Sequence, residues 1–273
     1  PLHSPRSLTF PTIRISHVTS HKMDILGNCL RYTLEVDDFS IAILLFSTIL
    51  MTVGLGSAIH FRTDQKRMSW MISLVNSFVL TVVGAIYLVG KIPTFKNFLW
   101  FGDNGRVVFH SLDNVSVLVS VWFTLANIFD LVFGFIFYRK YLHPLTAYAH
   151  HIVYIWILIT GITGNGGFAT FEPFAAGPVY MFIEELPTFL LALGSVFPAY
   201  RSDLGFGVSF FWLRLVYHAY MLMYSIYLGV DTVIPIMYVL TLALHVHWYH
   251  TWLTKYGWDL IFGKDKTKVK KEQ

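Results

Sequence analysis

The sequence predicts an all-α fold: a polytopic bundle of transmembrane helices with about seven spans, within a range of six to eight. The composition is the first observation behind this prediction, because 55% of the residues are hydrophobic and 13% are charged, whereas a soluble domain carries about 25% charged residues. The second is a mean hydropathy of +0.57. The third is a series of apolar runs along the 273 residues, since one membrane crossing needs roughly 20 apolar residues.

Apolar runs bounded by charged residues, Gly or Pro define the predicted spans. The runs are Phe39–Phe61, Met68–Gly90, Asn114–Tyr138, His150–Thr163, Phe174–Phe197, Phe206–Leu228 and Thr232–Leu253. The fourth run is short for a full crossing and could begin near Leu145. A re-entrant turn at Val107–Leu112 could add another element. These two points give the range of six to eight.

The chain divides into four segments. Residues 1–38 are predicted to be an N-terminal leader or lumenal segment, and residues 39–61 are the first span. Residues 62–263 form the main membrane domain, and residues 264–273 form a basic cytosolic tail. The leader contains Arg6, Arg14 and Lys22 with no acid before Asp24, so it resembles a transit segment; the alternative is a non-structural leader with Met23 as the true start.

Basic residues in the short loops predict the orientation, because Lys and Arg resist translocation. Most of them follow the odd-numbered spans: Arg62, Lys66, Arg67, Arg139, Lys140, Arg201 and the lysines after Lys264. Lys91, Lys96 and Arg106 run against this trend. The pattern predicts a cytosolic C-terminus and a lumenal N-terminus.

The last residues, Lys270-Lys271-Glu272-Gln273, match the dilysine signal that coat proteins recognise on endoplasmic reticulum membrane proteins. The sequence therefore predicts the endoplasmic reticulum membrane, with the plasma membrane as the alternative. The expected partners are membrane lipids and such a coat protein, and a homodimer is an option. Nucleic acid is not an expected partner, because the lysines crowd into the tail.

Ionisable residues inside the predicted spans mark the candidate site, because each charge at a helix centre costs about 2.5 to 3.5 kcal/mol on insertion scales. They are Asp130, His150, His151, Glu184, Glu185, Arg214 and His218. We expect one interior polar cavity to hold them. Prolines such as Pro178 and Pro187 predict an interrupted fifth helix that lines this cavity.

Helical spacing predicts which of these residues meet. Arg214 and His218 share a helix face, whereas Glu184 and Glu185 point about 100° apart. We expect Glu185 to face inward and pair with Arg214. Glu184 is then expected to stay protonated or to reach an interface.

The histidines predict no bound metal and no other bound cofactor. On one helix His245 and His247 point about 200° apart, so only His247 and His250 could meet one ion, and no His-x-x-His-His box occurs. We interpret the three as interfacial residues beside the aromatic side chains of Trp248 and its neighbours. The single cysteine, Cys29, cannot build a thiolate site alone. His150 and His151 open a span, where imidazoles serve either catalysis or lipid contact.

Four motifs in order resemble the TLC-domain family, the translocating-chain-associating and longevity-assurance group of membrane proteins. The motifs are Asn127-Ile128-Phe129-Asp130, His150-His151-Ile152, Glu185-Leu186-Pro187-Thr188 and Arg214-Leu215. The resemblance assigns residues 62–263 as the TLC domain.

The resemblance implies lipid chemistry. Ceramide synthases of this family transfer an acyl chain from acyl-CoA to a sphingoid amine, so His150 and His151 would be the catalytic pair, and Asp130 and Glu185 would line the cavity. This chain lacks the Ser-Tyr pair after the histidines and the His-Asp-x-x-Asp run of the synthases. It is therefore more similar to the smaller TLC-domain-containing proteins, which are implicated in membrane lipid composition.

Three functions follow as alternatives. The first is lipid homeostasis in ceramide, sphingolipid or phospholipid metabolism through N-acyl transfer, with acyl-CoA as a substrate. The second is a non-catalytic lipid sensor, carrier or trafficking adaptor. The third is a metal-dependent lipid hydroxylase that uses the scattered histidines.

Overall fold

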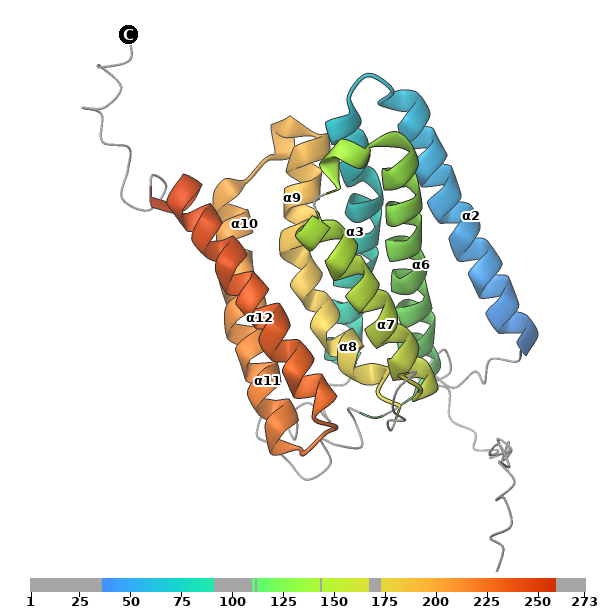
Figure 1. The fold of residues 1–273 in the computed structure, drawn as a ribbon, viewed down its shortest axis with the longest axis vertical. Coiled ribbons are helices and arrows are strands. Elements are labelled where there is room, and N and C mark those ends of the chain that lie inside the picture. Colours follow the sequence, from blue (N-terminus) through green and yellow to red (C-terminus); the bar gives the residue numbers. More distant parts are fainter. Residues whose placement is uncertain (1–35, 91–109, 111, 143, 167–172, 259–273) are drawn as a thin grey trace, which may run out of the picture.

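The computed structural model describes residues 36–90, 110, 112–142, 144–166 and 173–258. In these ranges the chain is helical and forms no strand, so the predicted all-α class is confirmed. Figure 1 shows the helices packed side by side as one bundle. Several predictions fall outside the described residues: the leader before Val36, Cys29, the bases of the second loop, most of the turn at Val107–Leu112, and the dilysine tail.

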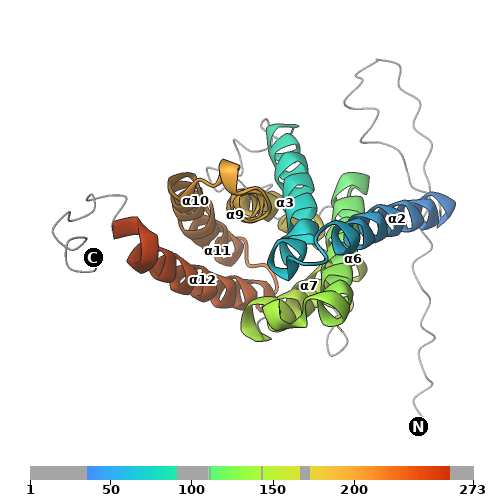
Figure 2. The same ribbon diagram turned by 90° about the horizontal axis from the view of Figure 1, so that it is seen from above.

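Helices α2 (Val36–His60), α3 (Gln65–Gly90) and α6 (Asn114–Phe137) form one side of the bundle. Figure 2 shows α2 at the outer edge, beside α6. Its apolar side chains are largely exposed, as Leu44 and Ile59 illustrate at 69% and 76%, and hydrocarbon is the medium in which such a surface is stable. The more buried α3 and α6 pack against the interior of the bundle.

Asp113 caps the start of α6 and ties it to the end of α3. Its carboxylate accepts a hydrogen bond from the Ser116 backbone N–H at 2.9 Å, which satisfies one of the unpaired amides of the first turn. The same carboxylate also accepts a hydrogen bond from the Tyr87 hydroxyl near the end of α3. The two helices are therefore joined at the end of the bundle opposite the α2–α3 turn.

Helix α7 (His150–Thr163) follows a π-helical turn, η2 (Pro144–Ala149). The helical segment thus extends before His150, close to the earlier start that the sequence allowed at Leu145. Helix α7 ends at Gly164, whose φ of 67° lies in the left-handed region where glycine carries no Cβ penalty. It packs along α6, so the paired histidines at its start lie near the last turns of α6.

The fifth apolar segment is interrupted, as the prolines predicted. It consists of α8 (Ala176–Met181), the 3-10 turn η3 (Phe182–Glu185) and α9 (Leu186–Val196). Pro187 has no N–H, so the α-helical hydrogen bond to the Ile183 carbonyl cannot form. The Leu186 N–H bonds that carbonyl instead, in the tighter i to i−3 pattern. Helix α9 packs against α3 and α10 and so connects the two sides of the bundle.

The remaining helices form the other side of the bundle. Helix α10 (Asp203–Ser209) continues through the π-helical segment η5 (Phe210–Tyr217) into α11 (His218–Tyr227). A turn with Gly229 in the left-handed region leads to α12 (Val233–Trp252) and its π-helical end, η6 (Leu253–Gly257). Helices α11 and α12 lie side by side in Figures 1 and 2.

In the described residues four helical stretches are long and apolar enough to cross a membrane. They are Asp38–His60, Gln65–Gly90, Asn114–Phe137 and Ala176–Val196. A polytopic membrane protein is therefore supported, and the count of seven spans stays a prediction.

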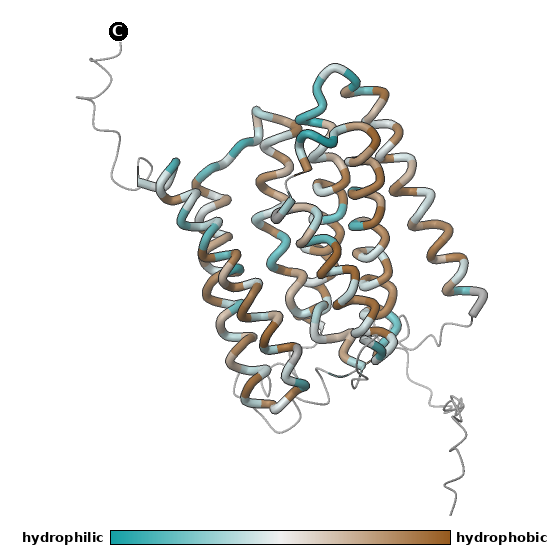
Figure 3. Tube along the Cα trace, in the orientation of Figure 1, coloured by the Kyte–Doolittle hydropathy of each residue, from teal (hydrophilic) through white to brown (hydrophobic). Residues whose placement is uncertain are grey.

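The described basic residues gather at one end of the bundle. Apart from Arg214, every Lys or Arg in the described ranges flanks the turns where α2, α6, α9 and α12 end: Arg62, Lys66, Arg67, Arg139, Lys140, Arg201 and Lys255. Figure 3 shows hydrophilic residues at this upper end and apolar residues along the helices. This arrangement is the one the positive-inside rule expects at a cytosolic face.

Gly84 allows α3 to approach the 3-10 turn η3. A Cβ at this position would lie 2.9 Å from the backbone nitrogen of Ile183, closer than real Cβ contacts allow. We expect Gly84→Ala to destabilise the chain by about 1 to 3 kcal/mol through overpacking, and to lower the melting temperature of the detergent-solubilised protein by several degrees.

Gly56→Ala is the matched control, because a Cβ at that helical position has nothing within 4 Å. It should leave the melting temperature unchanged or raise it slightly, since alanine is the better helix former. Equal melting temperatures for the two variants would contradict the close approach of α3 to η3.

Candidate functional site

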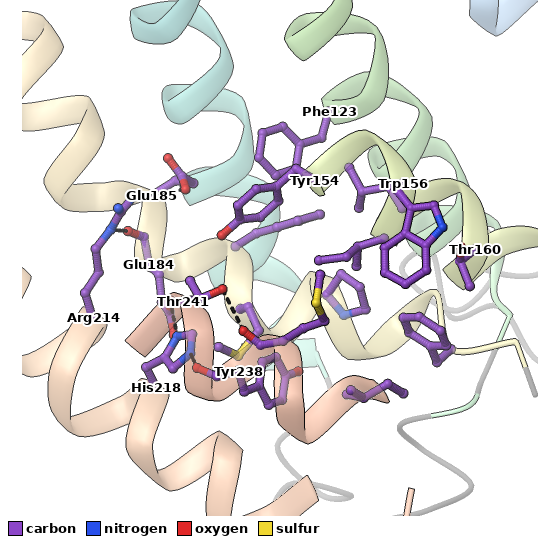
Figure 4. Close-up of a pocket in the computed structure, with 18 residues that line it drawn as sticks. Phe123, Tyr154, Trp156, Thr160, Glu184, Glu185, Arg214, His218, Tyr238 and Thr241 are labelled. Carbon is purple, nitrogen blue, oxygen red and sulfur yellow. Dashed lines mark hydrogen bonds and ion pairs between the residues drawn. The ribbon is translucent and has the colours of Figure 1, made fainter. Parts of the chain in front are cut away.

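Two cavities meet in the interior of the bundle. The polar cavity has a volume of about 530 Å³, and its polar lining includes Asn76, Asp130, His150, His151, Glu185 and Arg214. The apolar chamber, drawn in Figure 4, is smaller at about 70 Å³, and its lining includes Tyr154, Ile157, Phe174, Met181, Phe182 and Met237. Phe123, Glu185 and Arg214 line both. The two spaces therefore adjoin at an ion pair.

Arg214 is the buried cation at this junction, with an exposed fraction of 6%. Its Nε donates to the Glu184 carbonyl at 2.9 Å, and its Nη2 donates to Glu185 Oε1 at 3.0 Å and to Thr188 Oγ1 at 2.5 Å. Nη1 also lies 3.5 Å from Nε2 of His245 on α12. The Arg214 side chain on η5 therefore contacts three further helical segments, η3, α9 and α12. A buried charge persists in a membrane interior only when it is paired and hydrogen-bonded in this way.

Glu184 pairs with His218 rather than with Arg214. One carboxylate oxygen of Glu184 lies 3.0 Å from Nδ1 of His218, and the other lies 3.2 Å from it. Both residues are nearly inaccessible, with exposed fractions of 6% and 2%. Figure 4 shows the two side chains directed at each other beside Tyr238.

The pairing expected for Glu185 with Arg214 is present, whereas the expectation that Glu184 would reach an interface is wrong. Glu184 and Glu185 are both largely buried, and they contact different partners on the continuous helical segment formed by η5 and α11. Arg214 and His218 are four residues apart and share a helix face, as predicted. The two adjacent carboxylates of the 3-10 turn therefore both contact this face, Glu185 at Arg214 and Glu184 at His218. The expectation for Glu184 used the α-helical angle of about 100° between adjacent residues, whereas this pair lies in a 3-10 turn.

His150 and His151 both line the polar cavity, together with Asp130. Nδ1 of His151 lies 3.7 Å from Oδ2 of Asp130, and it has no hydrogen-bond partner among the described residues. The other oxygen, Oδ1, accepts a hydrogen bond from Tyr138 at 2.6 Å. The His150 ring packs against Tyr154 at a centroid distance of 4.5 Å. The structure therefore brings Asp130, His151 and His150 to one wall of the polar cavity.

His245 is a site residue that the sequence analysis misplaced at an interface. Its exposed fraction is 1%, whereas His247 and His250 on the same helix are exposed. A signal was present in the sequence, because Tyr238, Thr241 and His245 recur at i, i+3 and i+7 and so share one helix face. The first two line the apolar chamber, and the third contacts Arg214.

Comparison with protein-family models, with curated proteins and with solved structures gives no match for this chain. The similarity to TLC-domain proteins therefore rests on the four sequence motifs. The structure places residues from each of these motifs at the two adjoining cavities: Asn127, Asp130, His150, His151, Glu185, Thr188 and Arg214.

Replacing Arg214 should destabilise the bundle strongly. Arg214→Met leaves the Glu185 carboxylate buried without its cation, and breaking a buried ion pair costs about 3 to 5 kcal/mol. Thermal unfolding of the purified protein in detergent measures the effect. Arg201→Met is the matched control, because the ion pair of Arg201 with Asp203 is partly exposed and such pairs contribute about 0 to 1 kcal/mol. Similar losses in the two variants would contradict the structural role of Arg214.

Proposed function

We propose that this chain is a multi-pass TLC-domain protein of the endoplasmic reticulum membrane that binds an amphipathic lipid inside its helix bundle and transfers an acyl chain to it. One observation supports this proposal above the others. A polar cavity that contains two histidines and a carboxylate adjoins a small apolar chamber, so a head group and a short apolar part of a lipid each have a matching environment.

The polar cavity suits the polar part of the substrates. Lys66, from the end of the bundle where the basic residues gather, contributes to its lining, and a cation there favours the approach of a negatively charged group such as the phosphates of acyl-CoA. The adjoining chamber is lined mainly by aromatic and aliphatic side chains, which favour a short apolar segment of the lipid because they form no hydrogen bonds that it would leave unmatched.

The histidines supply a general base for acyl transfer from a thioester to an amine. The amine nitrogen attacks the thioester carbonyl carbon, an imidazole nitrogen accepts the proton that the amine loses, and the carbon–sulfur bond breaks. The imidazolium then donates that proton to the leaving thiolate, which departs as the free thiol. Asp130 faces Nδ1 of His151, so its carboxylate can orient this ring and leave Nε2 directed at the substrate.

The remaining parts of the proposal rest on the sequence. The predicted seven spans and the predicted cytosolic C-terminus agree with an endoplasmic reticulum lipid enzyme. The basic end of the described bundle supports the orientation, since it places Lys66, which lines the polar cavity, at the face expected to be cytosolic.

Loss of the histidine pair should abolish acyl transfer. Purified protein supplied with an acyl-CoA and a sphingoid base should form an N-acylated product, detected by mass spectrometry. His151→Ala and His150→Ala should each reduce the rate by about 100-fold or more, which is the contribution of a positioned general base. His247→Ala is the control, because that histidine is exposed on α12 and lies in neither cavity lining.

Equal rates for His151→Ala and His247→Ala, with both proteins folded, would refute the catalytic assignment of His151. Absence of product from the unsubstituted chain would refute acyl transfer between these two substrates.

A second candidate function is lipid binding without turnover, as in a sensor or carrier. The geometry that favours it is the separation of 3.7 Å between His151 and Asp130, which exceeds hydrogen-bond distance in the structure. In the same assay this function gives lipid bound to the purified chain, no product, and equal binding by the His150→Ala, His151→Ala double variant.

A further inference from the structure

Glu184, His218 and His245 form a buried cluster beside Arg214. They come from η3, α11 and α12, so three separate segments contribute one side chain each. A carboxylate oxygen and one ring nitrogen of each histidine lie within 4.8 Å of one another. The exposed fractions are 6%, 2% and 1%.

The hydrogen bonds of His218 fix which of its nitrogens faces the cluster. Nε2 lies 3.1 Å from the Tyr238 carbonyl oxygen, which can only accept, so Nε2 carries a proton and donates it. In the neutral ring Nδ1 then holds a lone pair, and this lone pair points at the Glu184 carboxylate 3.0 Å away.

His245 is held in the complementary tautomer. Its Nδ1 lies 3.0 Å from the Arg214 carbonyl oxygen and therefore donates to it. Nε2 is left with its lone pair toward the interior of the cluster, where Arg214 Nη1 is 3.5 Å away, at the limit of a hydrogen bond. Metal-binding histidines characteristically donate their second ring nitrogen to a backbone carbonyl or carboxylate, which orients the ring.

We propose that Glu184, His218 and His245 bind a divalent transition-metal ion. Three lone-pair donors converge in a buried space. Two of them, the Glu184 carboxylate and Nδ1 of His218, face each other at hydrogen-bond distance, but neither a carboxylate nor the unprotonated Nδ1 of a neutral imidazole has a hydrogen to donate. A positively charged species is therefore needed between the carboxylate oxygen and Nδ1. This revises the expectation of no metal, which assumed that the donors had to come from one helix.

Two imidazoles and one carboxylate form a donor set typical of zinc, and of iron where positions remain open. The surrounding charge favours a cation: Glu184 and Glu185 supply two carboxylates against the single guanidinium of Arg214. Arg214 uses its Nε and Nη2 on other acceptors, so it does not depend on His245. The ion would offset the negative charge of the second carboxylate, which the single guanidinium of Arg214 does not neutralise.

The site has room to form around an ion. Zinc ligands at about 2.0 to 2.1 Å lie about 3.3 Å apart in tetrahedral geometry, so donors now within 4.8 Å have to draw together by up to about 1.5 Å. Glu184 and His218 also line the apolar chamber, so an ion bound by them would border this chamber.

Metal content tests this proposal without reference to activity, so its outcome is independent of the proposed acyl transfer. The full chain is purified in detergent with an affinity tag that contains no histidine, in buffers without chelator, and its zinc, iron and manganese are measured by mass spectrometry. We expect about one equivalent of metal per chain. After removal of the ion, titration with Co²⁺ should restore binding and give visible d–d absorption.

Two pairs of variants locate the ion. Glu184→Gln keeps the shape of the side chain but removes its negative charge and should reduce bound metal at least 10-fold, whereas Asp203→Asn, at a partly exposed carboxylate outside the cluster, should retain it. His245→Ala should lose the metal, and His247→Ala, which is exposed on the same helix, should keep it. Removal of the ion should also lower the melting temperature of the unsubstituted chain and of both control variants.

Two results would overturn the proposal. One is an unsubstituted chain that contains no metal and binds no Co²⁺ or Zn²⁺ on titration, in which case a proton shared by Glu184 and His218 balances the pair. The other is a metal that persists in both Glu184→Gln and His245→Ala.

Discussion

The interior of this bundle depends on Arg214, a cation buried where hydrocarbon-like surroundings make an unpaired charge unstable. Its guanidinium reaches the Glu184 carbonyl, the Glu185 carboxylate and the Thr188 hydroxyl, which all lie on the interrupted helix formed by η3 and α9. Each contact fixes the position of η5 relative to this interrupted helix. The two sides of the bundle are therefore held at a polar junction, and both cavities border on it.

Departures from α-helical geometry place the polar groups at this junction. The 3-10 turn η3 precedes Pro187, and the π-helical segment η5 carries Arg214. Such segments leave backbone carbonyls available, and the Glu184 carbonyl accepts from Arg214 for this reason. Gly84 on α3 permits the close packing that covers the turn. The segments that depart from α-helical geometry thus lie at the candidate site.

Two groups of side chains border this junction. His150, His151 and Asp130 line the polar cavity, to whose lining Lys66 also contributes. Glu184, His218 and His245 form a buried cluster, and Glu184 and His218 also line the apolar chamber. Arg214 contacts members of the second group and lines the cavity of the first. A ligand that moves Arg214 would therefore affect both groups.

The sequence by itself determined the helical membrane class, the apolar segments, the interruption near Pro187 and the pairing of Glu185 with Arg214, because each follows from local composition or from spacing along one helix. Only the tertiary structure decided the rest. His245 joined Glu184 and His218 because three segments far apart in sequence pack together, and no spacing rule relates residues on different helices. The inward direction of Glu184 depended on a 3-10 turn, and the helices that this turn packs against come from other parts of the chain.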